Sequence, residues 1–251
     1  MKRLSILILF IFLIPILFNP PLTFAFDFVQ SAKVDLNGDG TAEEISVSAI
    51  PDSYGGFVLN VDKFSIKGKL WDNIDGFAIV DVDTSDEYKE IAVHTPGPSD
   101  DDGYFIYWYD GKSIKEMGRL WRWPKFFGNG IVLVEDWIGT FWSKIDKYVL
   151  NKETRTLRLI PQELYYVGIE TSVIEGFPIY RAKGDSTIIT NLKPQSKVMV
   201  VLYDPPSQHC KEKPHNDECF SDWYVIKSEE GIIGWARFAS FRNKLYLPWA
   251  D

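Results

Sequence analysis

Two stretches of this sequence match each other: VDLNGDGTAEEISV at residues 34–47 and VDVDTSDEYKEIAV at residues 80–93. They align without a gap at an offset of 46 residues and share valine, aspartate, glutamate and isoleucine at matching positions. A period of this size is typical of a repeated four-stranded β unit. Both copies run from a polar loop into β-branched residues, which favour a strand. The pair therefore predicts a repeated β architecture.

Each copy is followed by a further strand pair, at residues 54–68 and 101–118. Residues 130–159 show a third set of strands without the acidic loop. Residues 26–162 have room for about three such units, whereas a closed propeller needs roughly four to eight blades. We therefore expect a short stack of propeller-blade-like antiparallel meanders in this region.

The rest of the chain, residues 163–251, also consists of short apolar runs bounded by turn residues. No segment shows the sustained apolar stripe of an amphipathic helix. The fold class expected for the whole protein is all-β, with a repeat domain over residues 26–162 and a second domain over residues 163–251.

The N-terminal stretch MKRLSILILFIFLIPILFNPPLTFA, residues 1–25, has a basic start, an apolar run and a small residue at its end. This layout predicts a secretory signal peptide cleaved after Ala25. An uncleaved anchor is the less favoured alternative, because the apolar run is short for a membrane-spanning helix. We expect an extracytoplasmic protein that is secreted, periplasmic or associated with the cell wall.

The formal net charge of the chain is −8, and cleavage would remove two of its 27 basic residues and none of its 35 acidic ones. An acidic protein is repelled by nucleic acid and by anionic lipid surfaces. These partners are therefore not expected.

The first acidic loop has the composition of a calcium site. Oxygen-bearing side chains at positions one, three and five of a tight loop converge on one point, and a glycine at position six allows a sharp turn. The candidate ligands are Asp35, Asn37, Asp39, the carbonyl of Thr41, and Glu43 or Glu44 as the closing acid. The alternative is an acidic turn held by side-chain-to-backbone bonds, with no ion.

The second loop departs from this pattern. Asp81 and Asp83 stand at positions one and three, but Ser85 replaces the acid at position five and no glycine follows. Asp86 could substitute for that acid, and Glu90 stands in the place of Glu44. Extracellular calcium modules bind at around 10⁻⁴–10⁻³ M, so such a site would add about 1–2 kcal/mol of stability in millimolar calcium.

These two loops resemble the calcium loops of FG-GAP and VCBS repeat proteins. The resemblance covers residues 34–47 well and residues 80–93 less well. It implies β-propeller-like units, calcium as a structural cofactor at the loops, and a role in adhesion or surface binding.

Residues 178–202 and 223–238 resemble bacterial SH3-like domains, through the tyrosine-arginine pair before a polar loop and the final glycine-tryptophan. The resemblance implies a five- or six-stranded barrel that binds cell-wall peptides or an envelope protein. The residues it singles out for ligand contact are Tyr180, Arg181, Trp223 and Trp235. Packing in the barrel core is the alternative role for both tryptophans.

Two cysteines, Cys210 and Cys219, lie in an insert of this second domain. In an exported chain they favour a disulfide, which would contribute about 2.5–3 kcal/mol by loop entropy. A zinc site with His209 and His215 is the less favoured alternative.

Catalytic patterns are weak. No Ser-His-Asp arrangement, phosphate loop or metalloprotease helix is visible, and His94 is expected at an exposed strand end. Four tryptophans could line a sugar platform, although packing between layers is the favoured role: Trp121, Trp123, Trp137 and Trp142. We expect a non-enzymatic binding or adhesion protein. The alternatives are a cell-wall or polysaccharide hydrolase with an SH3-like targeting module, and a structural assembly subunit.

Overall fold

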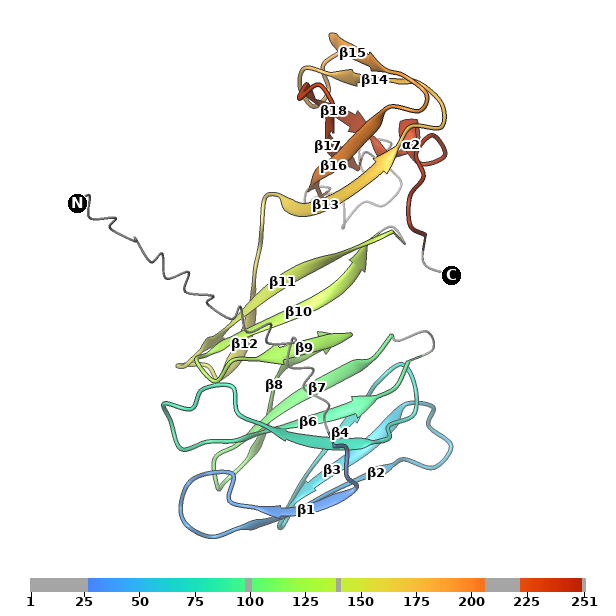
Figure 1. The fold of residues 1–251 in the computed structure, drawn as a ribbon. Helices are drawn as coiled ribbons and strands as arrows, with labels where there is room; N and C mark the ends of the chain where they lie inside the picture. Colours follow the sequence, from blue (N-terminus) through green and yellow to red (C-terminus); the bar gives the residue numbers. More distant parts are fainter. Residues whose placement is uncertain (1–26, 98–100, 139–140, 206–221, 250–251) are drawn as a thin grey trace, which may run out of the picture.

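The computed structural model describes residues 27–97, 101–138, 141–205 and 222–249 (Figure 1). Within these ranges the chain forms strands joined by turns, and one short helix, α2 (Phe238–Phe241). All of the described strand pairings are antiparallel. The expected all-β class is confirmed.

The first three sheets are four-stranded meanders in which strands adjacent in sequence pair with each other. The first contains β1 (Ser31–Val34), β2 (Glu43–Ala49), β3 (Gly56–Val61) and β4 (Phe64–Lys69). The second contains β5 (Gly76–Val80), β6 (Glu90–Thr95), β7 (Gly103–Tyr109) and β8 (Ile114–Trp121). The third contains β9 (Trp123–Phe126), β10 (Ile131–Ile138), β11 (Trp142–Asn151) and β12 (Thr156–Ile160).

The three sheets lie on one another because the second sheet has two apolar faces. Side chains alternate between the faces of a strand, and all seven residues of β7 are buried. Phe105 and Tyr107 belong to the core shared with the first sheet. Tyr104 and Ile106 belong to the core shared with the third. The second sheet is therefore the middle layer of the stack (Figure 1).

The first sheet has one apolar face and one polar face. Ile45 and Val47 of β2 point into the shared core, whereas Glu44 and Ser48, which flank them, are exposed. Because a polar face does not favour the packing of a further sheet, the first sheet forms one end of the stack.

The C-terminal sheet has six strands in the order β13-β16-β17-β18-β14-β15. They are β13 (Tyr165–Ser172), β14 (Phe177–Tyr180), β15 (Ile188–Leu192), β16 (Lys197–Asp204), β17 (Trp223–Ser228) and β18 (Ile233–Arg237). In the part of the chain that the structure describes, the edge strands β13 and β15 do not pair with each other, so the sheet is open. The closed barrel of the sequence-based expectation is not found.

The third sheet also contributes to the core of the C-terminal sheet. Phe141 and Trp142 pack among the apolar side chains of the C-terminal sheet. The Trp142 Nε1–H group donates to Tyr224 Oη at 3.3 Å, and Tyr165 donates its hydroxyl hydrogen to Asp146 Oδ1 at 2.8 Å. These buried contacts join the two parts of the chain, which lie next to each other in Figure 1.

Two sequence predictions lie outside the described residues: the signal peptide at residues 1–25 and the disulfide between Cys210 and Cys219. Among the described residues, no helix has the length and apolar character needed to cross a membrane.

Candidate metal centre

The first acidic loop joins β1 to β2 and folds through its own side chains. Asp35 Oδ1 accepts a hydrogen bond from Gly38 N at 2.8 Å, and its Oδ2 accepts one from Gly40 N at 2.9 Å. Asn37 and Asp39 each accept from the backbone N–H two residues later. Gly40 has a φ of 86°, a conformation that residues with a side chain rarely adopt. The alternating polar residues therefore fix a tight turn.

This turn brings three carboxylates together. One carboxylate oxygen from each of Asp35, Asp39 and Glu43 lies within 4.8 Å of the other two. Glu43 is only 4 % exposed, and its Oε2 accepts a hydrogen bond from Leu36 N at 2.7 Å. Burial is the main factor that raises the pKa of Glu43, and the neighbouring charges of Asp39 and Asp35 add to it. A cation between these groups would relieve their mutual repulsion.

The structure distinguishes between the two candidate closing acids. Glu43 faces the cluster. Glu44 is exposed, and its Oε1 lies 3.7 Å from Lys33 Nζ. Neighbouring residues of a strand point to opposite faces, so only one of the two glutamates can close the loop.

The cluster opens into a pocket of about 310 Å³ at the ends of three hairpins. Asn37 and Thr41 line this pocket together with Asp39 and Glu43. The β3–β4 and β7–β8 hairpins complete it with Asp62, Lys63, Phe64, Tyr109 and Gly111. The acidic side chains are therefore accessible to an ion from solvent.

The second loop joins β5 to β6 and is one residue longer than the first. Val34 pairs with Glu43 across the first loop, and Val80 pairs with Glu90 across the second. Glu90 Oε2 accepts from Val82 N at 2.9 Å, as Glu43 does from Leu36 N. The structural equivalent of Glu90 is therefore Glu43. The ungapped sequence alignment, which matches Glu90 with Glu44, is wrong from this position on, because the extra residue of the second loop shifts the strand register by one.

The carboxylates of the second loop are paired with cations of the protein itself. Asp83 Oδ2 lies 2.5 Å from Lys152 Nζ, and Asp86 Oδ2 lies 2.6 Å from Arg155 Nη1. Both cations come from the β11–β12 hairpin of the third sheet. The guanidinium of Arg155 also lies over the ring of Tyr88, 4.6 Å from its centroid. At the first loop the corresponding hairpin of the second sheet, β7–β8, contributes Tyr109 and Gly111 to the pocket. Among the described residues it forms no such ion pair with the carboxylates of the first loop.

The pKa values of the second loop differ in direction because of these contacts. Hydrogen bonds from Lys152 and Ser85 lower the pKa of Asp83 to about 2. Burial raises the pKa of Asp81, helped by the charge of Asp86. Burial also raises the pKa of Glu90 to about 7. The ionised Asp83 is therefore matched to Lys152, whereas Glu90 favours its protonated form.

The sequence did not indicate Lys152 and Arg155 as part of this site. They lie more than 60 residues beyond the second loop, in a hairpin with no motif of its own. One signal in the sequence could have suggested them. The second loop lacks the acid and the glycine of the first, so it offers a metal fewer ligands and its carboxylates need another partner.

Two of the C-terminal candidate residues lie side by side. Tyr180 of β14 pairs with Trp235 of β18, and both are partly exposed. Arg181 is exposed and bonded to Asp185 Oδ2 at 2.7 Å. Trp223 is 4 % exposed and lies beneath the Arg237 guanidinium, so its ring is not accessible to a ligand in this conformation.

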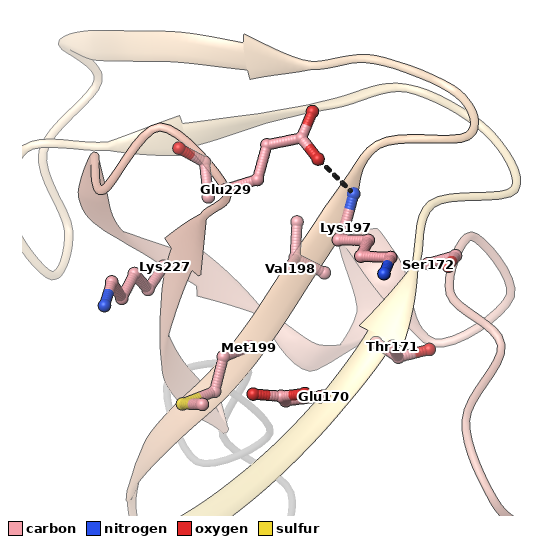
Figure 2. A pocket seen from close by; sticks show the side chains of 9 residues that line it. Glu170, Thr171, Ser172, Lys197, Val198, Met199, Lys227 and Glu229 are labelled. Atoms are coloured by element: carbon pink, nitrogen blue, oxygen red, sulfur yellow. Dashed lines mark hydrogen bonds between the residues drawn. The ribbon is translucent and has the colours of Figure 1, made fainter.

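A groove of about 350 Å³ crosses the same sheet (Figure 2). Glu170, Met199 and Lys227 form a row across β13, β16 and β17. At the end of the groove, Lys197 N donates to Glu229 Oε2 at 3.3 Å. The groove therefore presents acidic and basic groups around one thioether.

His94 is buried, not exposed as expected. It is 3 % exposed, and Phe28 stacks on its ring at a centroid distance of 3.9 Å. Its Nδ1 lies 2.7 Å from Asp75 Oδ1, and its Nε2 lies 3.5 Å from Asp102 Oδ2. The residues before β1 cover the strand end, which the sequence pattern did not predict.

Comparison of the chain with protein-family models, with curated proteins and with solved structures found no match.

Proposed function

We propose that this chain is an exported, non-enzymatic binding protein whose repeat sheets are braced by one calcium ion. The observation that carries the calcium assignment is the contrast between the two acidic loops. The second loop pairs its carboxylates with Lys152 and Arg155. The first loop gathers Asp35, Asp39 and Glu43. Among the described residues no lysine or arginine forms an ion pair with these three carboxylates, although Lys63 lines the same pocket.

Calcium fits the first loop better than other common metals. Its donors are carboxylate, amide and carbonyl oxygens, the ligands that calcium prefers in its six- to eight-fold coordination. Zinc would favour histidine or cysteine, and the pocket around this loop has neither. The ion would fix the first loop beside the β3–β4 and β7–β8 hairpins, which line the same pocket, and so stabilise the packing of the first sheet on the second.

The FG-GAP/VCBS resemblance of the loops and the three successive meanders support repeat units of the propeller-blade kind. The SH3-like resemblance of the C-terminal sheet supports a module that binds cell-wall peptides or an envelope protein. Its six-stranded sheet would be an opened version of that barrel. The partly exposed Tyr180 and Trp235 and the groove of Figure 2 offer this module aromatic, acidic and basic contacts.

Sedimentation with purified cell-wall sacculi tests the binding role. We expect the mature chain, residues 26–251, to pellet with sacculi in millimolar calcium. The double variant Trp235→Ala/Lys227→Glu should lose most of this binding, because it removes an aromatic contact and reverses a charge of the groove.

The matched control is Lys147→Glu, which reverses an exposed charge on the third sheet. Equal sedimentation of the double variant and the unaltered chain would reject the C-terminal sheet as the binding surface. An unaltered chain that stays in the supernatant would reject cell wall as the partner.

A further inference from the structure

A second groove, here called the Trp121 groove, lies at the edge between the second and third sheets. It has a volume of about 460 Å³ and is lined by Trp71, Asp101, Trp121, Arg122 and Asp136. Trp71 follows β4, Asp101 precedes β7, Trp121 and Arg122 lie at and just after the end of β8, and Asp136 belongs to β10, so residues far apart in sequence meet here. The groove shares no lining residue with the first acidic loop or with the groove of Figure 2.

The aromatic wall of the groove is held in a fixed orientation. Trp121 is 49 % exposed, and Trp71 stacks against it with a centroid distance of 3.9 Å and an interplanar angle of 23°. Trp71 in turn lies on Gly103, where an added Cβ would come within 1.4 Å of the Trp71 ring. An indole that is half exposed and yet immobilised presents a preformed apolar surface to solvent.

The polar wall is also fixed. Arg122 Nη2 lies 2.6 Å from Asp101 Oδ1, and Arg122 Nε lies 3.1 Å from Asp136 Oδ1. Lys144 Nζ lies 3.5 Å from the other oxygen of Asp136. Arg122 has a φ of 56°, which is uncommon for a residue with a long side chain.

We propose that the Trp121 groove binds a neutral sugar unit of a glycan. A pyranose ring has an apolar C–H face, which suits an exposed indole, and a rim of hydroxyls that both donate and accept. The carboxylates of Asp101 and Asp136 accept hydrogen bonds, and the Arg122 guanidinium donates them. A pocket with one apolar wall and a few fixed polar groups is the usual form of a small-ligand site.

The charges of the groove favour a neutral ligand over an anionic one. Arg122 and Lys144 are each engaged by carboxylates, and three aspartates, Asp101, Asp136 and Asp146, stand against these two cations. A phosphate or sulfate would have to displace one of these carboxylates, whereas a hydroxyl bonds to them without a change of charge. This inference deepens the proposed binding function by naming a ligand class for the repeat domain.

Titration with purified oligosaccharides tests the inference. Cellotetraose, maltotetraose and chitotetraose are added to the mature chain, and tryptophan fluorescence and calorimetry report binding. We expect at least one of them to bind, Trp121→Ala to weaken that binding by about tenfold or more, and Asp101→Asn to weaken it severalfold.

The matched control is Trp249→Ala. Trp249 is 44 % exposed and does not line the Trp121 groove, so its removal should leave the affinity for the sugar unchanged. The inference is overturned if none of the three sugars binds at about 10 mM, or if the Trp121 variant binds as tightly as the unaltered chain. The sacculus assay with the Trp235→Ala/Lys227→Glu variant reports on the C-terminal sheet, so failure of one proposal is distinguishable from failure of the other.

Discussion

Trp142→Ala is expected to lower the free energy of unfolding by about 3–5 kcal/mol, the range for removal of a buried large aromatic side chain. Trp142 is 6 % exposed, and its ring meets Tyr203 edge-on at a centroid distance of 5.3 Å. Truncation would leave a cavity and would also leave Tyr224 without its indole donor. Because Trp142 starts a strand of the third sheet, the loss should weaken the attachment of the C-terminal sheet to the repeat sheets.

Chemical denaturation of the mature chain measures this loss. Ile145→Ala on the same strand is the control, since Ile145 is 52 % exposed and its truncation should cost well under about 1 kcal/mol. A Trp142 variant that is as stable as the Ile145 variant would show that Trp142 does not join the two parts of the chain.

Glu90→Gln is expected to remove a pH dependence of stability. Burial raises the pKa of Glu90 from 4.5 to about 7, and the charges of Asp86 and Asp81 add to this rise, whereas the hydrogen bond from Val82 N and the charge of Arg155 oppose it. A raised carboxyl pKa means that the folded state binds more protons than the unfolded state between pH 4.5 and 7. The stability supplied by protonated Glu90 is therefore full below pH 4.5 and is lost as the pH rises through about 7.

The size of this loss is up to about 3 kcal/mol, at about 1.4 kcal/mol for each pKa unit. Glutamine keeps an oxygen that can accept the hydrogen bond from Val82 N but does not ionise. We expect the variant to match the unaltered chain near pH 4.5 and to be more stable than it at pH 8. Parallel stability profiles of the two proteins across this range would show that Glu90 ionises at an ordinary pH.

The strands and the repeat follow from the sequence, because period-two alternation and turn residues are local signals. The first loop is equally local: Asp35, Asn37 and Asp39 bond to backbone groups at most five residues away. Its geometry could therefore be anticipated from composition alone, apart from the choice between Glu43 and Glu44.

The choice between Glu43 and Glu44 depends on the strand register of β1 and β2. A change of one residue in loop length shifts this register and turns each side chain to the other face of the strand. An ungapped alignment matches Glu90 with Glu44, although the pairing across the strands matches it with Glu43. The pairing of Asp83 with Lys152 depends on a contact between two sheets. The position of Trp142 in the C-terminal core depends on how two parts of the chain pack. No local pattern carries either kind of information.

The contrast between the two acidic loops predicts that each chain binds one calcium ion. Calcium titrated into the metal-free mature chain by isothermal calorimetry should bind at one site per chain, with an affinity of around 10⁻⁴–10⁻³ M. Glu43→Gln should abolish this binding, because it removes the buried charge of the cluster. Glu44→Gln, which alters the neighbouring glutamate on the opposite face, should leave it intact. No binding by the unaltered chain, or equal binding by the Glu43 and Glu44 variants, would contradict the assignment of calcium to the first loop.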